Sequence, residues 1–372
     1  MTLKKKINSV TMINKMYTTD FKKPIKLVSS RAWRTYLGGK MISKLHGECG
    51  VDNHFPEEWL MSTVAARNSG RENIIEGVSL VSNNNITLAE LVQAYPVEML
   101  GNNHIARYGN TPGVLVKLLD SAERLTIQVH PTRESAKRLF NSEFGKTECW
   151  HIIGEREING EKPCIYIGFK EGVTRGYWQH LFDEQNIPAM LNCLHRVEVK
   201  TGDTFIIRGG VPHCIGAGCF LVEIQEPTDY TVRTERVTPS GLQVSDFMCH
   251  QGLGFDKMFD CFEYDGASLE DTLSHYRIES ICEKMDGYTV EHIIYPKVTD
   301  MFALEIVTVE QTATLEAKTF YGIYVLSGSG TISGERINTC DHYFVPASCG
   351  KITLTSTSGE PLKFLRCFGP EQ

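Results

Sequence analysis

Apolar residues follow a helical spacing in only a few parts of the chain. One such segment runs from about Thr87 to Val97, and its first residue is suited to cap a helix. A second short helix is predicted in "PTRESAKRLFNSEFG", where Pro131 can begin it and Gly145 suits its end. We expect a helical insertion around Tyr177 to Cys193.

Elsewhere the pattern favours strands. The stretch "GVLVKLLDSAERLTIQVHP" predicts strand, turn and strand, and "ECWHIIG", "KPCIYIGF" and "CFLVEIQEP" predict further strands. From about Val298 onward, short strands alternate with turns rich in Gly, Asn, Asp and Ser, which is typical of a sandwich or barrel. A mixed region before it, with a possible helix near Leu269–Cys282, marks a domain boundary.

Composition and charge narrow the class of protein. A chain of 372 residues is long enough for two domains with their own cores. Its net charge of −7 gives no general attraction for nucleic acid or anionic membranes. The basic residues Lys4–Lys6 precede no apolar signal-peptide core, and no apolar run reaches the length of a membrane span. Twelve scattered cysteines predict reduced thiols and a cytoplasmic location.

Four polar residues have the types and positions of a metal shell. Gln128 and His130 lie two apart on a predicted strand, so both side chains face one side of the sheet. Glu148 begins a later strand, and His213 follows another. Two imidazoles, a carboxylate and an amide oxygen can bind zinc and leave room for water or substrate. Two isolated histidines would more often be unrelated polar residues at strand ends.

The glycine spacing around His213 favours the metal interpretation. From Gly202 to His213 the spacing is close to the second motif of cupins, which are small jelly-roll barrels, with Arg208 where a proline is usual. The glycines permit the tight turn that aims the histidine into the barrel.

Longer segments resemble one family within the cupins. The segments "LLDSAERLTIQVHPT", "GKTECWHIIG" and "GGVPHCIGAGCFLVEIQEPTDYTVR" are similar in order and spacing to class I mannose-6-phosphate isomerases (phosphomannose isomerases) of the short bacterial type. The resemblance extends upstream through "LAELVQAYPVEMLG" and downstream to "GSGTISGE" and "DHYFVPAS", so it covers most of the chain.

The resemblance implies a set of functional residues. It implies one Zn²⁺ per chain, a catalytic arginine, a lysine lining the active site, a carboxylate close by and a hydroxyl near the substrate phosphate. The implied zinc ligands are Gln128, His130, Glu148 and His213; the other residues are, in the same order, Arg233, Lys146, Glu223 and Thr126.

The implied reaction is the reversible conversion of D-mannose 6-phosphate to D-fructose 6-phosphate through a zinc-stabilised enediolate. A metal and the permanent charge of Arg233 can stabilise the developing oxyanion. The base could be Glu223, Lys146 or a metal-bound water, and the sequence does not choose between them. Glu223 could instead be a structural ion-pair partner of Arg233 or Lys146.

Three other functions stay open. The first is a related zinc cupin isomerase or epimerase acting on another sugar or sugar phosphate. The second is a non-catalytic sugar-phosphate-binding protein, which would not need Lys146, Glu223 and Arg233. The third is an iron-dependent cupin dioxygenase, whose usual ligand triad does not resemble a shell with a neutral amide.

The chain departs from the family pattern in three places. Glu226 and Pro227 follow the strand of Glu223, where the family usually has Gln-Asn-Ser-Asp. Leu60 replaces a family glutamate after Trp59, and a His-Pro pair beyond it is absent. A Trp-Gly-Gly motif near the start is expanded here to "WRTYLGG". These departures affect the exact substrate more than the class of reaction.

The expected fold is all-β, with two cupin (jelly-roll) barrels and a few helices inserted in the first. We expect an N-terminal extension over residues 1–20, a metal-binding catalytic domain over 21–250, a connecting segment over 251–297 and a degenerate metal-free cupin over 298–372. His342 lies too early in the last domain's motif to be a metal ligand. The expected partner is a small sugar phosphate, with no nucleic acid or membrane, and the chain is expected to be a monomer or homodimer.

Overall fold

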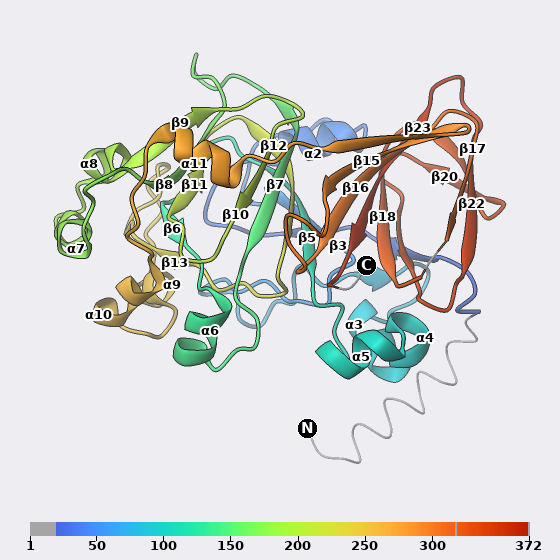
Figure 1. Cartoon of the computed structure of the whole chain (residues 1–372), viewed down its shortest axis with the longest axis horizontal. Helices are drawn as coiled ribbons and strands as arrows, with labels where there is room; N and C mark the ends of the chain where they lie inside the picture. Colours follow the sequence, from blue (N-terminus) through green and yellow to red (C-terminus); the bar gives the residue numbers. More distant parts are fainter. Residues whose placement is uncertain (1–19, 317, 371–372) are drawn as a thin grey trace.

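The computed structural model describes residues 20–316 and 318–370, so nearly all of the predicted extension over residues 1–20 lies outside the described residues. Strands dominate, and the named strands pair antiparallel in four sheets (Figure 1). This confirms a β-rich antiparallel fold with helices added to it. Closure of the sheets into two barrels stays a prediction.

Two sheets carry the predicted site. The six-stranded sheet has the order β10 (Thr204–Ile207), β7 (Glu148–Glu155), β12 (Cys219–Gln225), β5 (Leu115–Asp120), β3 (Glu57–Leu60) and β2 (Ser30–Ala32). The five-stranded sheet has the order β13 (Val232–Arg233), β6 (Gln128–Val129), β11 (His213–Ile215), β8 (Cys164–Phe169) and β9 (Leu194–Glu198). One apolar cluster contains Trp150 and Phe205 from the first sheet and Ile167 from the second, so the two sheets pack face to face.

The other two sheets form a second pair. The eight-stranded sheet has the order β14 (Ile281–Met285), β15 (Tyr288–Ile294), β16 (Ala303–Val309), β23 (Leu362–Phe368), β18 (Tyr321–Ser327), β21 (His342–Val345), β1 (Ile25–Val28) and β4 (Leu80–Val81). The four-stranded sheet has the order β17 (Thr312–Glu316), β22 (Lys351–Ser356), β19 (Ser329–Ile332) and β20 (Glu335–Asn338). Val307, Ile323 and Leu354 belong to the core between them.

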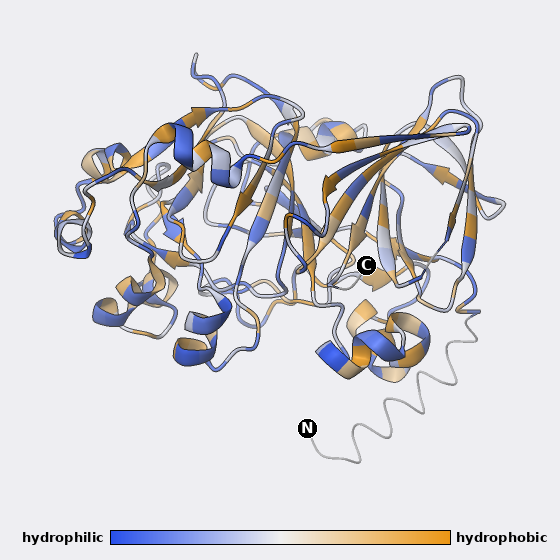
Figure 2. Ribbon diagram, in the orientation of Figure 1, coloured by the Kyte–Doolittle hydropathy of each residue, from blue (hydrophilic) through white to orange (hydrophobic). Residues whose placement is uncertain are grey.

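Alternation along the strands places the six-stranded sheet in the middle of the molecule. In β12, Val222 and Ile224 pack with Ile306 and Leu365 of the eight-stranded sheet, whereas Leu221 packs toward the five-stranded sheet. Figure 2 shows the matching alternation of hydrophobic and hydrophilic residues along strands. Because successive side chains point to opposite faces, the odd-numbered residues of β12 face the five-stranded sheet.

Helices cover the sheets and end where the sequence indicates. Thr87 caps α3 through a capping box with Glu90, and Thr132 caps α6. The predicted insertion forms α7 and α8. In chain order the helices are α2 (Lys40–Leu45), α3 (Leu88–Ala94), α4 (Pro96–Leu100), α5 (Asn102–Tyr108), α6 (Arg133–Phe140), α7 (Arg175–Asp183), α8 (Ile187–Asn192), α9 (Asp246–His250), α10 (Phe255–Met258), the 3-10 turn η1 (Phe259–Cys261) and α11 (Leu269–Tyr276).

The sheets do not follow the expected domain boundaries. Strands β14 and β15, which lie in the segment expected to be a connection, extend the eight-stranded sheet of the C-terminal part. Strand β1 from the N-terminal part joins the opposite side of the same sheet through β21. The possible helix near Leu269–Cys282 ends at Tyr276, and Ile281 already begins β14. These pairings depend on contacts between distant segments, which local periodicity does not reveal.

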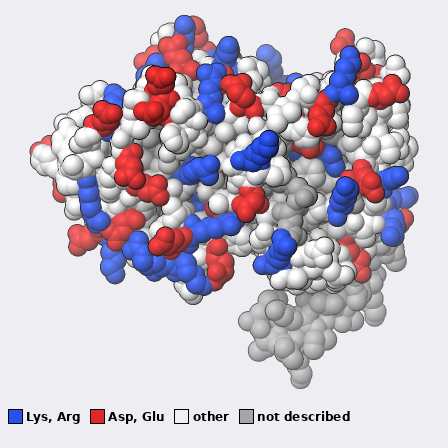
Figure 3. Space-filling view, in the orientation of Figure 1, with Lys and Arg blue, Asp and Glu red and all other residues white. Residues whose placement is uncertain are grey.

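Charged side chains are distributed over the surface. On the face drawn in Figure 3, basic and acidic residues are interspersed. No helix within the described ranges is long and apolar enough to cross a membrane.

Candidate metal centre and active site

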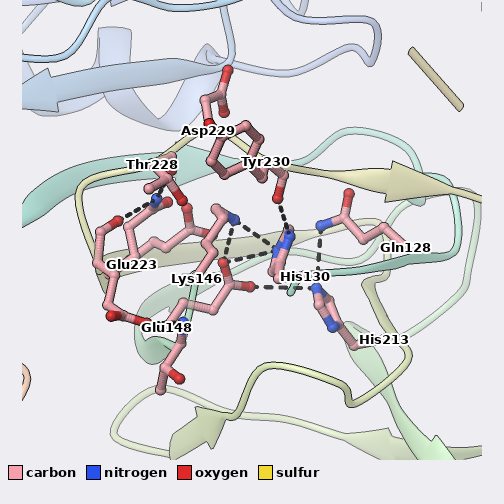
Figure 4. Close-up of polar contacts among 12 residues, drawn as sticks. Gln128, His130, Lys146, Glu148, His213, Glu223, Thr228, Asp229 and Tyr230 are labelled. Atoms are coloured by element: carbon pink, nitrogen blue, oxygen red, sulfur yellow. Dashed lines mark hydrogen bonds and ion pairs between the residues drawn. The ribbon is translucent and has the colours of Figure 1, made fainter. Parts of the chain in front are cut away.

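The four expected metal ligands meet between the six-stranded and five-stranded sheets. Gln128 in β6 pairs with His213 in β11, His130 directly follows β6, and Glu148 begins β7 on the opposite sheet. One nitrogen of each imidazole and one oxygen of Glu148 lie within 4.8 Å of one another. All three of these residues are buried, and Figure 4 shows their polar ends pointing toward one another.

Hydrogen bonds orient both imidazoles toward this cluster. His130 Nδ1 donates to the Tyr230 carbonyl at 2.8 Å, and His213 Nδ1 donates to the Val211 carbonyl at 2.8 Å. Because a carbonyl can only accept, each ring carries its hydrogen on Nδ1 and presents the lone pair of Nε2. Glu148 Oε2 lies 3.2 Å from His130 Nε2, and the buried Glu148 Oε1 has no hydrogen-bond donor among the described residues.

Burial and charge keep these groups in the protonation states that a metal needs. Burial, followed by the charge of Lys146, lowers the pKa of His130 to about 3. Burial also lowers the pKa of His213. Burial acts to raise the pKa of Glu148, but the charge of Lys146 and the two imidazoles outweigh it and leave this pKa below its ordinary value. At neutral pH the cluster therefore offers two neutral imidazoles and a carboxylate.

Lys146 and Gln128 complete the cluster. Lys146 Nζ lies 2.5 Å from Glu148 Oε2 and 2.7 Å from His130 Nε2, so a cationic group already occupies the space between the expected ligands. Gln128 lies with its amide nitrogen 3.3 Å from His213 Nε2, and half a turn of the amide would present its oxygen instead. Nitrogen and oxygen donors of this kind fit a divalent metal ion.

Close packing of turns holds the ligands in place. Gly209, before His213, lies so near Pro131 that a Cβ would meet the Pro131 carbonyl oxygen at 2.7 Å. A Cβ on Gly145, before Glu148, would meet the same oxygen at 2.6 Å. The segments before Glu148 and His213 therefore both pack against the backbone that follows His130. This close approach requires glycine at positions 145 and 209, because a side chain would clash there.

A cavity opens beside the cluster of expected ligands. The predicted residues Thr126, Gln128, Lys146, Glu223 and Arg233 all line it. The cavity therefore brings the expected ligand set next to every other residue that the family resemblance implies.

Arg233 contributes a charge that no carboxylate contacts directly. Its Nη1 donates to the carbonyls of Thr231 and Met248, each at 3.1 Å, and burial lowers its pKa. No ion pair of Arg233 occurs within residues 20–316 and 318–370. Such a half-buried cation, with donors left over, is suited to bind an anionic substrate group.

Glu223 has partners other than those expected. Alternation in β12 turns its side chain toward the cavity, where Oε1 accepts from Lys117 Nζ at 2.7 Å and Oε2 accepts from Trp150 Nε1 at 3.2 Å. Glu223 thus takes part in an ion pair, but its partner is Lys117 and not Arg233 or Lys146.

Sequence reasoning missed Arg124 and four further charged residues of the cavity. Lys117 could have been found, because it is a single charge within the otherwise apolar strand "VLVKLL". Glu57, Asp229 and Arg34 carry no comparable local signal, since each lies in a segment with other polar residues. All four line the cavity.

Comparison with known proteins agrees with this geometry. The sequence model of the phosphomannose isomerase type I catalytic domain matches residues 73–146, which include Gln128, His130 and Lys146. This part of the chain is thus similar to the catalytic domain of type I phosphomannose isomerases. The chain is therefore an enzyme of the isomerase class.

Curated relatives are similar to the chain in sequence, and solved structures share its fold. Mannose-6-phosphate isomerase ManA of Bacillus subtilis is 28% identical over 71% of this chain and 80% of its own. The mannose-6-phosphate isomerase of Streptococcus mutans is 31% identical over 42% of this chain and 46% of its own. The crystal structure of the Bacillus subtilis mannose 6-phosphate isomerase covers 93% of this chain with a TM-score of 0.71 at 22% identity. A phosphomannose isomerase variant from Salmonella typhimurium covers 94% with a TM-score of 0.69 at 13% identity.

Two of the three departures from the phosphomannose isomerase pattern lie off the cavity wall. Leu60 is buried in the core between the six-stranded and eight-stranded sheets. Glu226 accepts from Arg133 Nε at 2.6 Å and from the Thr147 backbone at 3.0 Å, so it ties α6 to the loop of Lys146. Pro227 follows it and is not among the cavity residues. Only the "WRTYLGG" segment reaches the cavity.

Proposed function

We propose that this protein interconverts D-mannose 6-phosphate and D-fructose 6-phosphate, with one zinc ion held by Gln128, His130, Glu148 and His213. The observation that carries the proposal is the buried cluster of ligands beside a cavity that Arg233 and Lys146 also line. An aldose–ketose isomerase needs this combination, because charge develops on substrate oxygens while a proton moves between neighbouring carbons.

The residues divide the chemical tasks among themselves. A zinc ion bound here would act as a Lewis acid toward the substrate carbonyl. The guanidinium of Arg233 keeps its charge throughout the reaction and stabilises negative charge on the substrate. Glu223 and Lys146 both line the cavity and are candidates for the group that accepts the proton from carbon.

The substrate phosphate fits the side of the cavity formed by β6 and β13. Arg233 in β13 pairs with Gln128, and Thr126 lies just before β6 and lines the cavity. Arg124 also lines this side, but its guanidinium already contacts both oxygens of Glu235, at 2.6 and 2.9 Å. Arg233 and Thr126 are therefore the donors most available to a phosphate.

The location of the protein belongs to the same proposal. All twelve cysteines have free thiols, and most are buried. Free thiols are typical of reducing compartments, where sugar phosphates are metabolised, so we infer that the enzyme works in the cytoplasm.

A coupled assay for isomerisation of mannose 6-phosphate tests the proposal. We expect turnover by the purified protein, loss of turnover after treatment with a chelator, and recovery when zinc is added back. Magnesium and iron added to separate samples test the identity of the metal. No turnover by protein that contains one zinc ion per chain would contradict the proposed reaction and direct the search to other sugar phosphates.

A further inference from the structure

One wall of the cavity is formed by a short segment near the start of the chain. Arg34, Thr35 and Tyr36 of "WRTYLGG" line the cavity, together with Glu57 and Asp229. Arg34 and Tyr36 each retain only 6% of their accessible surface. The segment is therefore an internal part of the pocket wall and not a surface loop.

Arg34 is fixed between two carboxylates. Its Nε donates to Glu57 at 2.8 Å, and its Nη1 and Nη2 donate to the two oxygens of Asp229 at 3.2 and 3.1 Å. The guanidinium also stacks near the ring of Trp59, with 5.0 Å between its central carbon and the ring centroid. These contacts use three of its five N–H groups, so two donors remain.

Glu57 is held as firmly as Arg34. It accepts from the Tyr36 hydroxyl at 2.8 Å and from Trp59 Nε1 at 2.7 Å, in addition to the bond from Arg34. The wall therefore keeps its geometry whether or not a ligand is present, which lowers the entropic cost of binding.

The charges of this wall do not suit a phosphate. Arg34 lies against two carboxylates, and its attraction, together with that of Lys117, outweighs their burial so that the pKa values of Glu57 and Asp229 stay below the ordinary range. Within the wall itself two carboxylates face one guanidinium, which does not favour an anion. Hydroxyl groups, in contrast, can donate to the carboxylates and accept from the remaining guanidinium donors.

Asn68 adds an acceptor that has no partner. It lines the same cavity and retains 6% of its surface. Its Nδ2 donates to the Trp33 carbonyl at 2.8 Å, whereas the buried Oδ1 receives no hydrogen bond in the described part of the chain. A buried acceptor without a donor is costly, so this oxygen is suited to a ligand hydroxyl.

We propose that this wall is the subsite that recognises the hydroxyl groups of the sugar chain, with Arg34 as its specificity-determining residue. We call it the Arg34 wall and define it by Arg34, Tyr36, Glu57, Asn68 and Asp229. The phosphate then lies on the side of Arg233, away from the Arg34 wall. This inference rests on the proposed function, because it assumes a polyhydroxylated phosphate ester as the substrate.

Binding measurements with two probes distinguish recognition of the phosphate from recognition of the hydroxylated carbon chain. The probes are inorganic phosphate, which has no carbon chain, and a hexitol 6-phosphate, which has the hydroxyls and the phosphate but cannot react. Isothermal titration calorimetry on the zinc-loaded full chain gives both dissociation constants. The first variant is Arg34→Lys, which keeps the positive charge but loses the planar set of guanidinium N–H donors. The second is Asn68→Ala, which removes the Oδ1 acceptor described above.

We expect Arg34→Lys to weaken the hexitol phosphate about tenfold and to change inorganic phosphate less than twofold, because a lost hydrogen bond to a charged group is worth about that factor. Asn68→Ala should act in the same direction, and it carries the test if Arg34→Lys does not fold. Arg71→Lys is the matched control, since Arg71 pairs with Glu76 in the neighbouring loop and does not line the cavity.

Three results would overturn the proposal. Equal weakening of both probes would show that the Arg34 wall binds phosphate, and no weakening of either would show that it binds nothing. An equal loss of hexitol phosphate binding in Arg71→Lys would show a general effect of folding. The proposed function fails separately: wild-type protein that prefers the hexitol phosphate yet does not turn over mannose 6-phosphate would leave the subsite standing and change the reaction.

Discussion

At the scale of single residues, His213 depends on contacts from several directions. Its Nδ1 donates to the Val211 carbonyl, its ring packs at an edge against Trp150 with centroids 5.4 Å apart, and its Nε2 faces Glu148. The ring can thus turn only one nitrogen toward a metal. Removing it deletes one expected ligand and leaves the other expected ligands in place.

We therefore expect His213→Ala to lose bound metal and to lower turnover by at least about a hundredfold. Metal content per chain, measured by mass spectrometry, and the isomerase assay check this. His180→Ala is the control, because His180 is exposed and pairs with Glu184 in α7 and its cap, away from the cluster.

Arg233→Ala is the informative counterpart. It should keep the metal and still lower turnover, since the Arg233 side chain donates to backbone carbonyls, and its pairing with Gln128 is a strand pairing of the backbone. Metal loss in this variant would mean that Arg233 supports the cluster and does not act on the substrate.

At the scale of elements, the turn between β10 and β11 sets the position of His213. A Cβ on Gly209 would meet the Pro131 carbonyl oxygen and the Thr132 nitrogen, each at 2.7 Å, and both belong to the backbone that follows His130. Neither atom can move without moving a segment that carries a ligand.

Gly209→Ala should therefore weaken metal binding by roughly tenfold or more and lower the free energy of unfolding by about 1–3 kcal/mol. Competition with a chelating dye and urea unfolding of the metal-free protein measure the two effects. Gly176→Ala in α7 is the control, because nothing lies within 4 Å of the added carbon. Unchanged metal affinity in Gly209→Ala would contradict the idea that this packing positions the ligands.

At the scale of the whole molecule, the layer between the six-stranded and eight-stranded sheets contains buried polar groups. His342 in β21 is 1% exposed, and its Nε2 accepts from the Met61 backbone at 2.7 Å, which joins the N-terminal and C-terminal parts. Burial lowers the pKa of His342 to about 4, against an opposing effect of Glu58. The folded protein thus keeps this imidazole neutral at pH values where the unfolded chain takes up a proton.

Stability should fall as the pH drops below about 6.5, the pKa of an unfolded histidine, toward the folded value. Between pH 7 and 5 His342 should account for about 2 kcal/mol of this loss, because each pH unit below 6.5 costs about 1.4 kcal/mol. Urea unfolding of metal-free wild type and His342→Gln at both pH values measures the difference. Equal losses in the two proteins would mean that His342 titrates normally in the folded state.

Local sequence determined a large part of this protein. Strand alternation put Gln128 and His130 on one face, Thr87 and Thr132 capped their helices, and the glycines before His213 allowed the tight turn. These features act over a few residues, so they are readable without knowing the partners of each segment. The β-rich class and the choice of candidate residues followed from them.

Tertiary structure alone decided which distant groups meet. Arg34 contacts Asp229, 195 positions further along the sequence, and Lys117 pairs with Glu223, 106 positions further along. Strand β1 from the N-terminal part pairs with β21 from the C-terminal part in the eight-stranded sheet. A buried charge requires a partner, but its own segment does not specify which one, because several folds could satisfy it. The Arg34 wall and the sheet boundaries therefore became visible only when the layers were packed together.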